Sequence, residues 1–352
     1  MTVEKRLKSI LELYGIKAEN SNIVPFGTGL VNNTWKISSS SRTYILQRIN
    51  QDVFKNPLDI ALNIRQIGNY LSQNNPEYLF VNPETTLSGK DLVFNTEYGY
   101  FRLFPFVAGS HTSDVLSSIH QAFEAAKEFG KFTKILSEFP AQRLKITIPN
   151  FHNLPLRYQQ FELALINGNQ KKIKEGHEYI KFLKKNFEIV SISEKITRHP
   201  SFKKRVTHHD TKVSNILFNE KNRPLCVIDL DTVMPGYFIS DVGDMFRTYL
   251  SPVSEEEKDF EKIQIRNDYF KAISEGYLSE MNTELTNLEK EHFLYAGKFM
   301  IYMQSLRFIT DFLTGDGYYG AKYEGHNLVR AGNQITLLQR LMAKENDLVK
   351  RV

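Results

Sequence analysis

The stretch His208-His209-Asp210-Thr211-Lys212-Val213-Ser214-Asn215, followed by Val227-Ile228-Asp229-Leu230-Asp231, decides the fold class of this chain. An asparagine stands five residues after Asp210, and a second aspartate, Asp229, stands nineteen residues after it inside an apolar run. A carboxylate without a partner in such a run would be strongly destabilising or would stay protonated. Because a bound divalent cation removes that cost, we expect Asp229 to hold a metal ion.

These residue types suit phosphoryl transfer. Such a reaction needs a carboxylate that accepts the proton of an attacking hydroxyl, and oxygen ligands that hold Mg²⁺ against the nucleotide phosphates. Asp210 can fill the first role, with Asn215 and Asp229 in the second. The spacing is similar to that of the kinase catalytic loop, in which a histidine, here His208, stands two residues before the aspartate. In the alternative reading these residues only shape a loop and a turn, which leaves the kinase-like spacing of His208, Asp210, Asn215 and Asp229 without an explanation.

Composition narrows the class of protein. With 352 residues, 41% hydrophobic residues and 12% aromatics, the chain is typical of a globular protein with two lobes. The formal net charge of +5 is spread along the chain, which favours a small anionic ligand such as ATP over nucleic acid. Cys226, the single cysteine, lies in an apolar strand pattern and reads as a buried, inert thiol in a reducing cytoplasm.

The N-terminus reads as an amphipathic helix that stops near Gly15, and not as a signal peptide. No apolar run reaches eighteen residues, so we expect no membrane span. These two observations together predict a cytoplasmic protein without a membrane partner.

Residues 23–50 predict a strand, a glycine turn and two further strands. Gly27, Thr28 and Gly29 form the turn, and glycines there would let a phosphate approach the backbone. A plain hairpin turn is the alternative for this motif by itself. Its position, roughly 180 residues before Asp210, is where a kinase small lobe keeps the loop that covers the nucleotide.

Residues 44–50 would be the strand on which kinases carry the lysine that contacts the phosphates. Here Gln47 stands in that register, and Arg48 is the nearest cation in the sequence. The predicted helix over residues 57–73 also lacks the expected partner glutamate. Neutralisation of the phosphates is therefore expected to fall on Mg²⁺ and on backbone groups.

Residues 100–109 predict a strand that runs into a linker between the lobes. Pro105 has a carbonyl but no N–H, so in a kinase hinge it can only be the acceptor for the adenine base. This register makes Phe104 the gatekeeper and Val107 the N–H donor. An edge strand ended by proline is the alternative.

After Gly109 the chain is expected to be mostly helical. Residues 119–136 carry apolar side chains at helical spacing. Residues 171–187 predict a basic amphipathic helix whose lysines form a solvated face, with a membrane or nucleic-acid surface as the weaker alternative.

The chain resembles the aminoglycoside phosphotransferase and choline kinase superfamily, and within it the bacterial N-acetylhexosamine 1-kinases. Beside the glycine turn and the residues quoted at the start, the resemblance rests on blocks spread over nearly the whole chain: 44–50, 102–107, 148–152, 205–217, 227–236, 241–244 and 306–319. It implies an α+β, two-lobed protein-kinase-like fold, with a small antiparallel-sheet N-lobe over residues 1–107 and a mostly helical C-lobe over residues 108–352.

The resemblance also implies a reaction: ATP with Mg²⁺ would phosphorylate the anomeric hydroxyl of a hexosamine or related sugar. By position, Asp210 would bond the reacting hydroxyl while Arg307 and Tyr318 hold the sugar. Gln47 in place of lysine is usual in this branch. Two alternatives stay open, an ion pair between Arg307 and Asp311 at i+4 on a helix, and a packed, structural Tyr318.

Leu30 departs from the family pattern, because the hexosamine kinases carry at this position a histidine that reaches the sugar. Leucine forms no hydrogen bond, which leaves the identity of the acceptor sugar open. Two other functions remain as hypotheses: a kinase of the same fold that acts on an amino alcohol or an aminoglycoside, and a nucleotide-binding pseudokinase scaffold. Either a monomer or a homodimer would fit, without nucleic acid as a partner.

Overall fold

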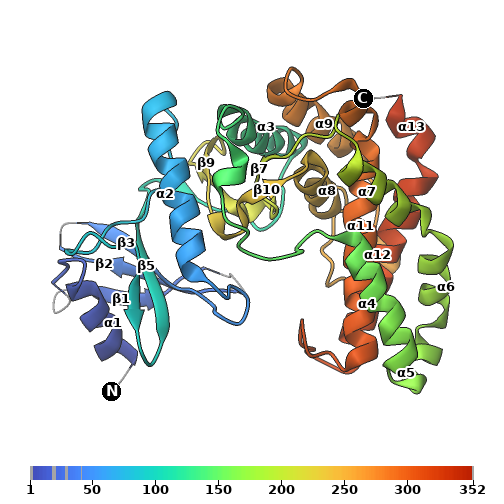
Figure 1. Ribbon diagram of the computed structural model, residues 1–352, viewed down its shortest axis with the longest axis horizontal. Helices are drawn as coiled ribbons and strands as arrows, with labels where there is room; N and C mark the ends of the chain where they lie inside the picture. The colour runs from blue at the N-terminus through green and yellow to red at the C-terminus, as the bar shows by residue number, and fades with distance from the viewer. Residues whose placement is uncertain (1–2, 18–20, 28–30, 41, 351–352) are drawn as a thin grey trace. The chain divides into compact units, whose positions relative to one another are not determined.

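The structure is a computed structural model that describes residues 3–17, 21–27, 31–40 and 42–350 (Figure 1). The chain forms two compact units. The first, here the sheet unit, comprises Met1–His111, Phe139–Pro149 and Leu217–Pro235. The second, here the helical unit, comprises Thr112–Glu138, Asn150–Ile216 and Gly236–Val352. The sequence division after Val107 lies close to the first crossing between the units, and its reading as a nucleotide lobe and an acceptor lobe stays a prediction. Within the described ranges no helix is both long and apolar enough to cross a membrane.

The sheet unit contains five antiparallel strands in the order β1-β2-β3-β5-β4. Their bounds are β1 (Asn22–Pro25), β2 (Asn33–Ser38), β3 (Thr43–Arg48), β4 (Val93–Asn95) and β5 (Gly99–Pro105). The strand pattern predicted over residues 23–50 is confirmed. Gly27 has a φ of 81°, a conformation that glycine adopts without steric cost. Thr28, Gly29 and Leu30 lie outside the described residues.

One face of this sheet is apolar and is covered by α1 (Val3–Glu12). Ile37 of β2, Leu46 of β3 and Leu103 of β5 are fully buried and pack with Ile10 and Leu11 of the helix. Side chains alternate between the two faces of a strand, so single apolar positions in three neighbouring strands suffice to build this core. Burying each such side chain stabilises the fold by about 2 kcal/mol.

The rest of the sheet unit carries α2 (Pro57–Asn74) and a second, three-stranded sheet in the order β6-β8-β9. The strands are β6 (Ser110–His111), β8 (Ile216–Asn219) and β9 (Pro224–Val227). The Cys226 side chain in β9 is buried, as predicted. Asp229 follows β9 and begins a short 3₁₀ turn, η4 (Leu230–Thr232), which leads into β10 (Met234–Gly236).

The helical unit is built around α11 (Phe293–Thr314), which is buried on nearly all sides and packs against α4, α8 and α12 (Figure 1). A second packed pair, α3 and α9, approaches closely because Gly276 faces the backbone of α3, where a Cβ would lie 2.3 Å from the Phe123 carbonyl oxygen. The other elements of the unit are α3 (Ile119–Ile135), α4 (Leu154–Asn167), α5 (Gln170–Glu175), α6 (His177–Lys185), α7 (Glu188–Arg198), β7 (Arg205–Thr207), α8 (Phe238–Tyr249), α9 (Asn267–Met281), α10 (Asn287–Glu291), α12 (His326–Ala343) and α13 (Glu345–Val349).

The single helix predicted over residues 171–187 is wrong. The structure has two helices, α5 and α6, separated at Gly176, where an added Cβ would lie 3.2 Å from the Ile309 side chain. Lys172 is also not a solvated charge, because its Nζ lies 2.7 Å from the Asp316 carboxylate and 4.6 Å from the centre of the Phe312 ring.

Candidate active site

The segment from His208 to Asn215 forms a loop in the helical unit that ends in a 3₁₀ turn, η3 (Val213–Asn215). The His208 side chain is fully buried, and its ring meets the Phe129 ring of α3 edge to face at 5.3 Å. His209 has a φ of 67°, and its Nδ1 lies 3.0 Å from the Thr207 carbonyl oxygen. The first histidine of the motif therefore anchors the loop to the core and does not face a ligand.

Two carboxylates of α8 hold the backbone of this loop. Asp241 accepts hydrogen bonds from the N–H groups of His208 (3.0 Å) and His209 (2.7 Å), and Asp244 accepts one from Thr211 (2.8 Å). The two aspartates stand at i and i+3, so they share a face of the helix. Burial raises the pKa of Asp241 to about 7 even though two N–H donors favour the carboxylate. Sequence analysis found this pair only as a block of the family resemblance and gave it no role.

Replacing Asp241 with alanine is expected to lower the free energy of unfolding by about 2–4 kcal/mol, because two buried N–H donors would lose their acceptor. Urea unfolding monitored by circular dichroism measures the change. Glu275→Ala on α9 is the matched control, since it removes an exposed carboxylate paired with Lys271 and should cost less than about 0.5 kcal/mol. Equal losses for the two variants would contradict the anchoring role.

Asp210 lies at the centre of the loop with its charge stabilised. Burial by itself would raise its pKa, but Lys212 and His208, with hydrogen bonds from Lys212 and Asn215, hold the pKa of Asp210 below its ordinary value. The Lys212 Nζ is 3.1 Å from Asp210 Oδ1. Asp210 is therefore a carboxylate at neutral pH, which is the form that can accept a proton. Lys212, two residues after Asp210, was missed in the sequence analysis, although its spacing was visible.

Asn215 is fixed by Asp210. Its amide Nδ2 donates to the Asp210 carbonyl oxygen at 2.8 Å and to Oδ2 at 3.0 Å. Both amide hydrogens are thus used, and the amide oxygen accepts no hydrogen bond from the described residues. An amide oxygen in this state is the kind of hard ligand that Mg²⁺ accepts.

Asp229 belongs to the sheet unit and has a left-handed backbone, with φ 58° and ψ 62°. An aspartate tolerates this conformation better than most residues but still at a cost, so its surroundings must hold it there. The segment after it is anchored twice: Asp231 pairs with Arg102 of β5, and the Val233 carbonyl oxygen accepts from Asn63 of α2 at 3.1 Å. The described residues contain no group of three or more His, Cys, Asp or Glu side chains that could hold a metal ion by themselves.

Gln47 faces Arg102 across β3 and β5, and its Oε1 accepts from Arg102 Nε (3.0 Å) and Nη2 (2.8 Å). The cation beside Gln47 is therefore Arg102. Arg48, the nearest cation in the sequence, instead donates from Nε to the Tyr98 carbonyl oxygen at 2.7 Å. Adjacent residues of a strand point to opposite faces, which explains why the neighbour in sequence is not the neighbour in space.

The end of β5 offers the polar groups expected of a hinge. The Phe106 N–H donates to the Thr43 carbonyl oxygen, and Pro105 faces Tyr44 in the next pair. Hydrogen-bonded and non-bonded pairs alternate in an antiparallel ladder, so the Pro105 carbonyl points away from β3. The Val107 N–H has no partner among the described residues, while its carbonyl accepts from Ser110. Binding of adenine by Pro105 and Val107 stays a prediction.

Arg307, on α11, lies among aromatic rings. Its guanidinium carbon is 5.7 Å from the centre of the Phe151 ring, 5.5 Å from that of Tyr318 and 5.3 Å from that of Tyr319. The Phe151 ring in turn lies 6.4 Å from the ring of His209, the residue before Asp210. Phe151 thus lies between Arg307 and the loop His208–Asn215 within the helical unit.

The suggested ion pair between Arg307 and Asp311 is absent. Asp311 instead accepts hydrogen bonds from the backbone N–H groups of Tyr318 and Tyr319, each at 2.8 Å. Arg307 donates to the Tyr318 hydroxyl at 3.1 Å and forms no ion pair with a carboxylate of the described ranges. Tyr318 is 69% exposed, so it is not a packed core aromatic.

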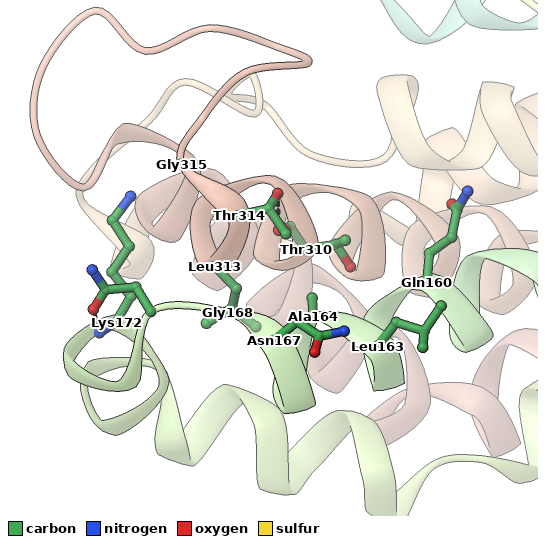
Figure 2. Close-up of a pocket in the computed structure, with 11 residues that line it drawn as sticks. Gln160, Leu163, Ala164, Asn167, Gly168, Lys172, Thr310, Leu313, Thr314 and Gly315 are labelled. Carbon is green, nitrogen blue, oxygen red and sulfur yellow. Dashed lines mark hydrogen bonds between the residues drawn. The ribbon is translucent and has the colours of Figure 1, made fainter.

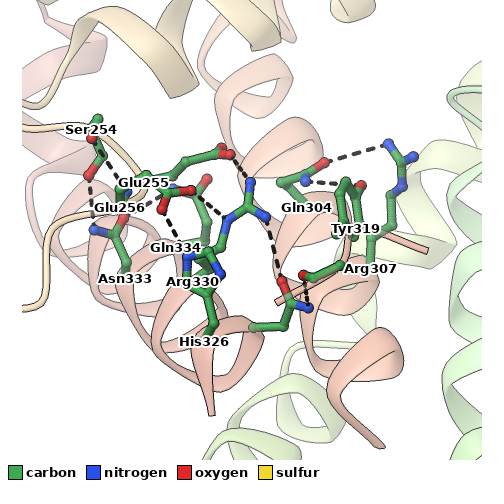
Figure 3. Close-up of polar contacts among 12 residues, drawn as sticks. Ser254, Glu255, Glu256, Gln304, Arg307, Tyr319, His326, Arg330, Asn333 and Gln334 are labelled. Atoms are coloured by element: carbon green, nitrogen blue, oxygen red, sulfur yellow. Dashed lines mark hydrogen bonds and ion pairs between the residues drawn. The ribbon is translucent and has the colours of Figure 1, made fainter. Parts of the chain in front are cut away.

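Two glutamates on the Arg330 side of Tyr319, Glu255 and Glu256, are paired with that arginine (Figure 3). Arg330 lies between Glu255 and Glu256 on one side and Tyr319 on the other, and Arg247 donates to Glu255 at 2.6 Å. Although burial would raise the pKa of Glu255, Arg247 and Arg330 hold it below its ordinary value. Both carboxylates form ion pairs with arginines, so they do not make an acidic pocket that could bind a cationic acceptor.

Two cavities lie in the helical unit. One, of about 210 Å³, borders the loop His208–Asn215 at Lys212 and Ser214 and extends to Gln334 of α12. The other, of about 610 Å³, is an open groove between α4 and the C-terminal end of α11 (Figure 2). No predicted site residue lines the larger groove, so cavity size alone does not identify the site.

Comparison with known proteins supports the kinase reading of the fold. A profile of the phosphotransferase enzyme family matches residues 22–269. Among solved structures, spectinomycin phosphotransferase in complex with ADP and spectinomycin aligns with a TM-score of 0.59 at 15% identity, covering 97% of this chain and 98% of that one. A microcompartment-associated aminopropanol kinase aligns with 0.63 at 14% identity, covering 99% of each chain. A choline kinase from Cryptosporidium parvum Iowa II aligns with 0.58 at 14% identity, covering 99% of this chain and 96% of that one. The fold is therefore kinase-like, with an antiparallel-sheet unit and a mostly helical remainder.

Proposed function

Because the chain belongs to the phosphotransferase enzyme family, we propose that it is an ATP- and Mg²⁺-dependent kinase that phosphorylates the anomeric hydroxyl of a hexosamine or related sugar. The observation that carries the choice of acceptor is Arg307, a cation framed by aromatic rings and without a carboxylate partner in the described ranges. A positively charged acceptor would be repelled there, whereas a guanidinium and aromatic faces suit the hydroxyl groups and C–H faces of a sugar.

In this proposal Asp210 orients the acceptor hydroxyl and takes its proton as the new bond to phosphorus forms. Lys212 keeps Asp210 ionised before the reaction. The amide oxygen of Asn215 and the carboxylate of Asp229 would hold Mg²⁺, which takes its remaining oxygen ligands from phosphate and water. Bound ATP would supply the phosphoryl group, and Mg²⁺ would neutralise the negative charge of the phosphates.

The test is an acceptor panel with ATP and Mg²⁺: N-acetylhexosamines and hexoses against choline, aminopropanol and spectinomycin, the compounds named for the structural neighbours. Phosphorus NMR of the product assigns the phosphorylated position. We expect turnover of a sugar at its anomeric carbon. Turnover of the amino alcohols or of spectinomycin alone would replace the sugar reading with the second candidate, and nucleotide binding without any turnover would favour a scaffold.

Replacing Leu30 with histidine is expected to raise kcat/KM for N-acetylhexosamines by about tenfold, the worth of one added hydrogen bond, without changing KM for ATP. The reason is the family resemblance, in which a histidine at this position reaches the sugar. Leu30→Phe is the control, since it changes size but adds no hydrogen-bonding group. The same sugar profile for both variants and the wild type would show that this position does not contact the acceptor.

A further inference from the structure

The sheet unit contains a buried ion pair whose members come from distant parts of the chain. Arg102 on β5 and Asp231 in the turn after Asp229 each expose only 2% of their side chains, and Arg102 Nη1 lies 2.5 Å from Asp231 Oδ1. The same guanidinium donates twice to Gln47 Oε1 on β3. The pair therefore ties the turn that follows Asp229 to two neighbouring strands.

Asp231 also reaches the end of the glycine turn. Its second carboxylate oxygen accepts from Asn32 Nδ2 at 2.8 Å, and Asn32 Oδ1 accepts from the Asn50 N–H at 3.0 Å. The network thus joins four segments: the residues just after the glycine turn, β3, β5 and the turn after Asp229. Each member is held from at least two directions, so the arrangement is fixed by several bonds at once.

Stability alone does not explain this pair. Removing two charges from water costs free energy that their attraction repays only in part, and well-packed apolar residues of similar volume often stabilise a fold equally or better. The pair stands, however, where the usual kinase connection is missing. Gln47 occupies the lysine register of β3, and α2 contributes Asn63, which bonds to the backbone of Lys145 and Val233.

We propose that Arg102 and Asp231 are a positioning pair for the metal ligand Asp229, in a sheet unit that lacks the usual lysine–glutamate pair. It holds Asp229 in its left-handed conformation so that the carboxylate is presented to the metal. Asn63 anchors Val233 on the far side of the same turn. Arg102 is too deeply buried to contact the phosphates itself. The inference rests on the proposed function, because it assigns the pair a role in nucleotide binding.

The experiment measures ATP affinity by isothermal titration calorimetry with and without Mg²⁺, together with the melting temperature of each variant. We expect Arg102→Met and Asp231→Asn to lower the Mg²⁺-dependent gain in ATP affinity by about 10–100-fold, the usual effect of losing a residue that orients a metal ligand. The double variant Arg102→Met/Asp231→Leu, which replaces the pair with apolar groups, should recover the melting temperature but not the Mg²⁺-dependent gain. Arg65→Met is the control, since it breaks another ion pair of the sheet unit, the partly exposed pair with Asp91, and it should keep the full Mg²⁺-dependent gain.

A double variant with the full Mg²⁺-dependent gain would overturn the positioning role and leave only a structural pair. Because the double variant is expected to recover the melting temperature, it keeps the test valid if the single variants do not fold. A wild-type protein that gains no ATP affinity from Mg²⁺ would instead contradict the proposed function, so the two failures are distinguishable.

Discussion

Asp210→Asn is expected to lower kcat by at least ~10²-fold, the scale for removing a general base, while KM for ATP changes little. The asparagine has nearly the same shape, and its amide oxygen can still accept from Asn215 Nδ2, whose other bond goes to the backbone carbonyl of residue 210. What is lost is the charge that Lys212 stabilises and the capacity to take a proton. Steady-state kinetics with the best sugar of the acceptor panel measures the effect.

Asp259→Asn is the control for this variant, because Asp259 is an exposed acidic residue of the same unit that caps a short 3₁₀ turn and lies 3.7 Å from Lys262 Nζ. Its kcat should equal that of the wild type. Turnover by Asp210→Asn at the rate of the control would contradict the assignment of Asp210 as the base.

Asp229→Asn is expected to abolish the rise in melting temperature that ATP with Mg²⁺ gives the wild type. At a ligand concentration 100 times the dissociation constant, binding stabilises a protein by about 2.7 kcal/mol, and losing the metal ligand removes most of that term. Asparagine is the sharper substitution because it tolerates the left-handed backbone of residue 229, whereas Asp229→Ala would add strain there. Thermal melts with ATP alone and with ATP plus Mg²⁺ separate the metal effect from the nucleotide effect.

Asp52→Asn, an exposed aspartate of the sheet unit, is the control and should keep the full rise. If Asp229→Asn kept it as well, Asp229 would not be the metal ligand. Ligand-free melting temperatures of both variants should stay close to the wild type, which shows that a lost response is not a lost fold.

Sequence reasoning predicted most of the fold because the strands and long helices carry strong local signals. The strands over residues 23–50 are short runs rich in apolar residues separated by turn residues, and the helices near residues 57–74 and 119–135 repeat apolar residues at helical spacing. The helix over residues 171–187 was wrong because its apolar spacing outweighed Gly176, a poor helix former that stands where α5 ends and α6 begins.

The sequence displays the motif residues of the candidate site, but it does not show which other residues hold them in place. Asp210, Asn215 and Asp229 stand at spacings that a single sequence displays. Arg102 could not be linked to Gln47 before the register of β3 and β5 was known, because a shift of one residue reverses every side chain of a strand. The partner of Asp311 was missed because helical spacing suggests a side-chain pair, whereas the carboxylate binds backbone N–H groups of a later loop.

The hydrogen bonds that Asp311 accepts from the backbone of residues 318 and 319 have an evolutionary consequence. Asp311 binds Tyr318 and Tyr319 through their main-chain N–H groups, so these two bonds do not depend on which side chains stand at positions 318 and 319. Asn327 also holds the loop through its main chain, since its Nδ2 donates to the carbonyl oxygen of Gly320. Substitution of Tyr318 or Tyr319 therefore leaves these main-chain bonds in place, so the proposed acceptor side chains can change while α11 and α12 still anchor the loop through its backbone.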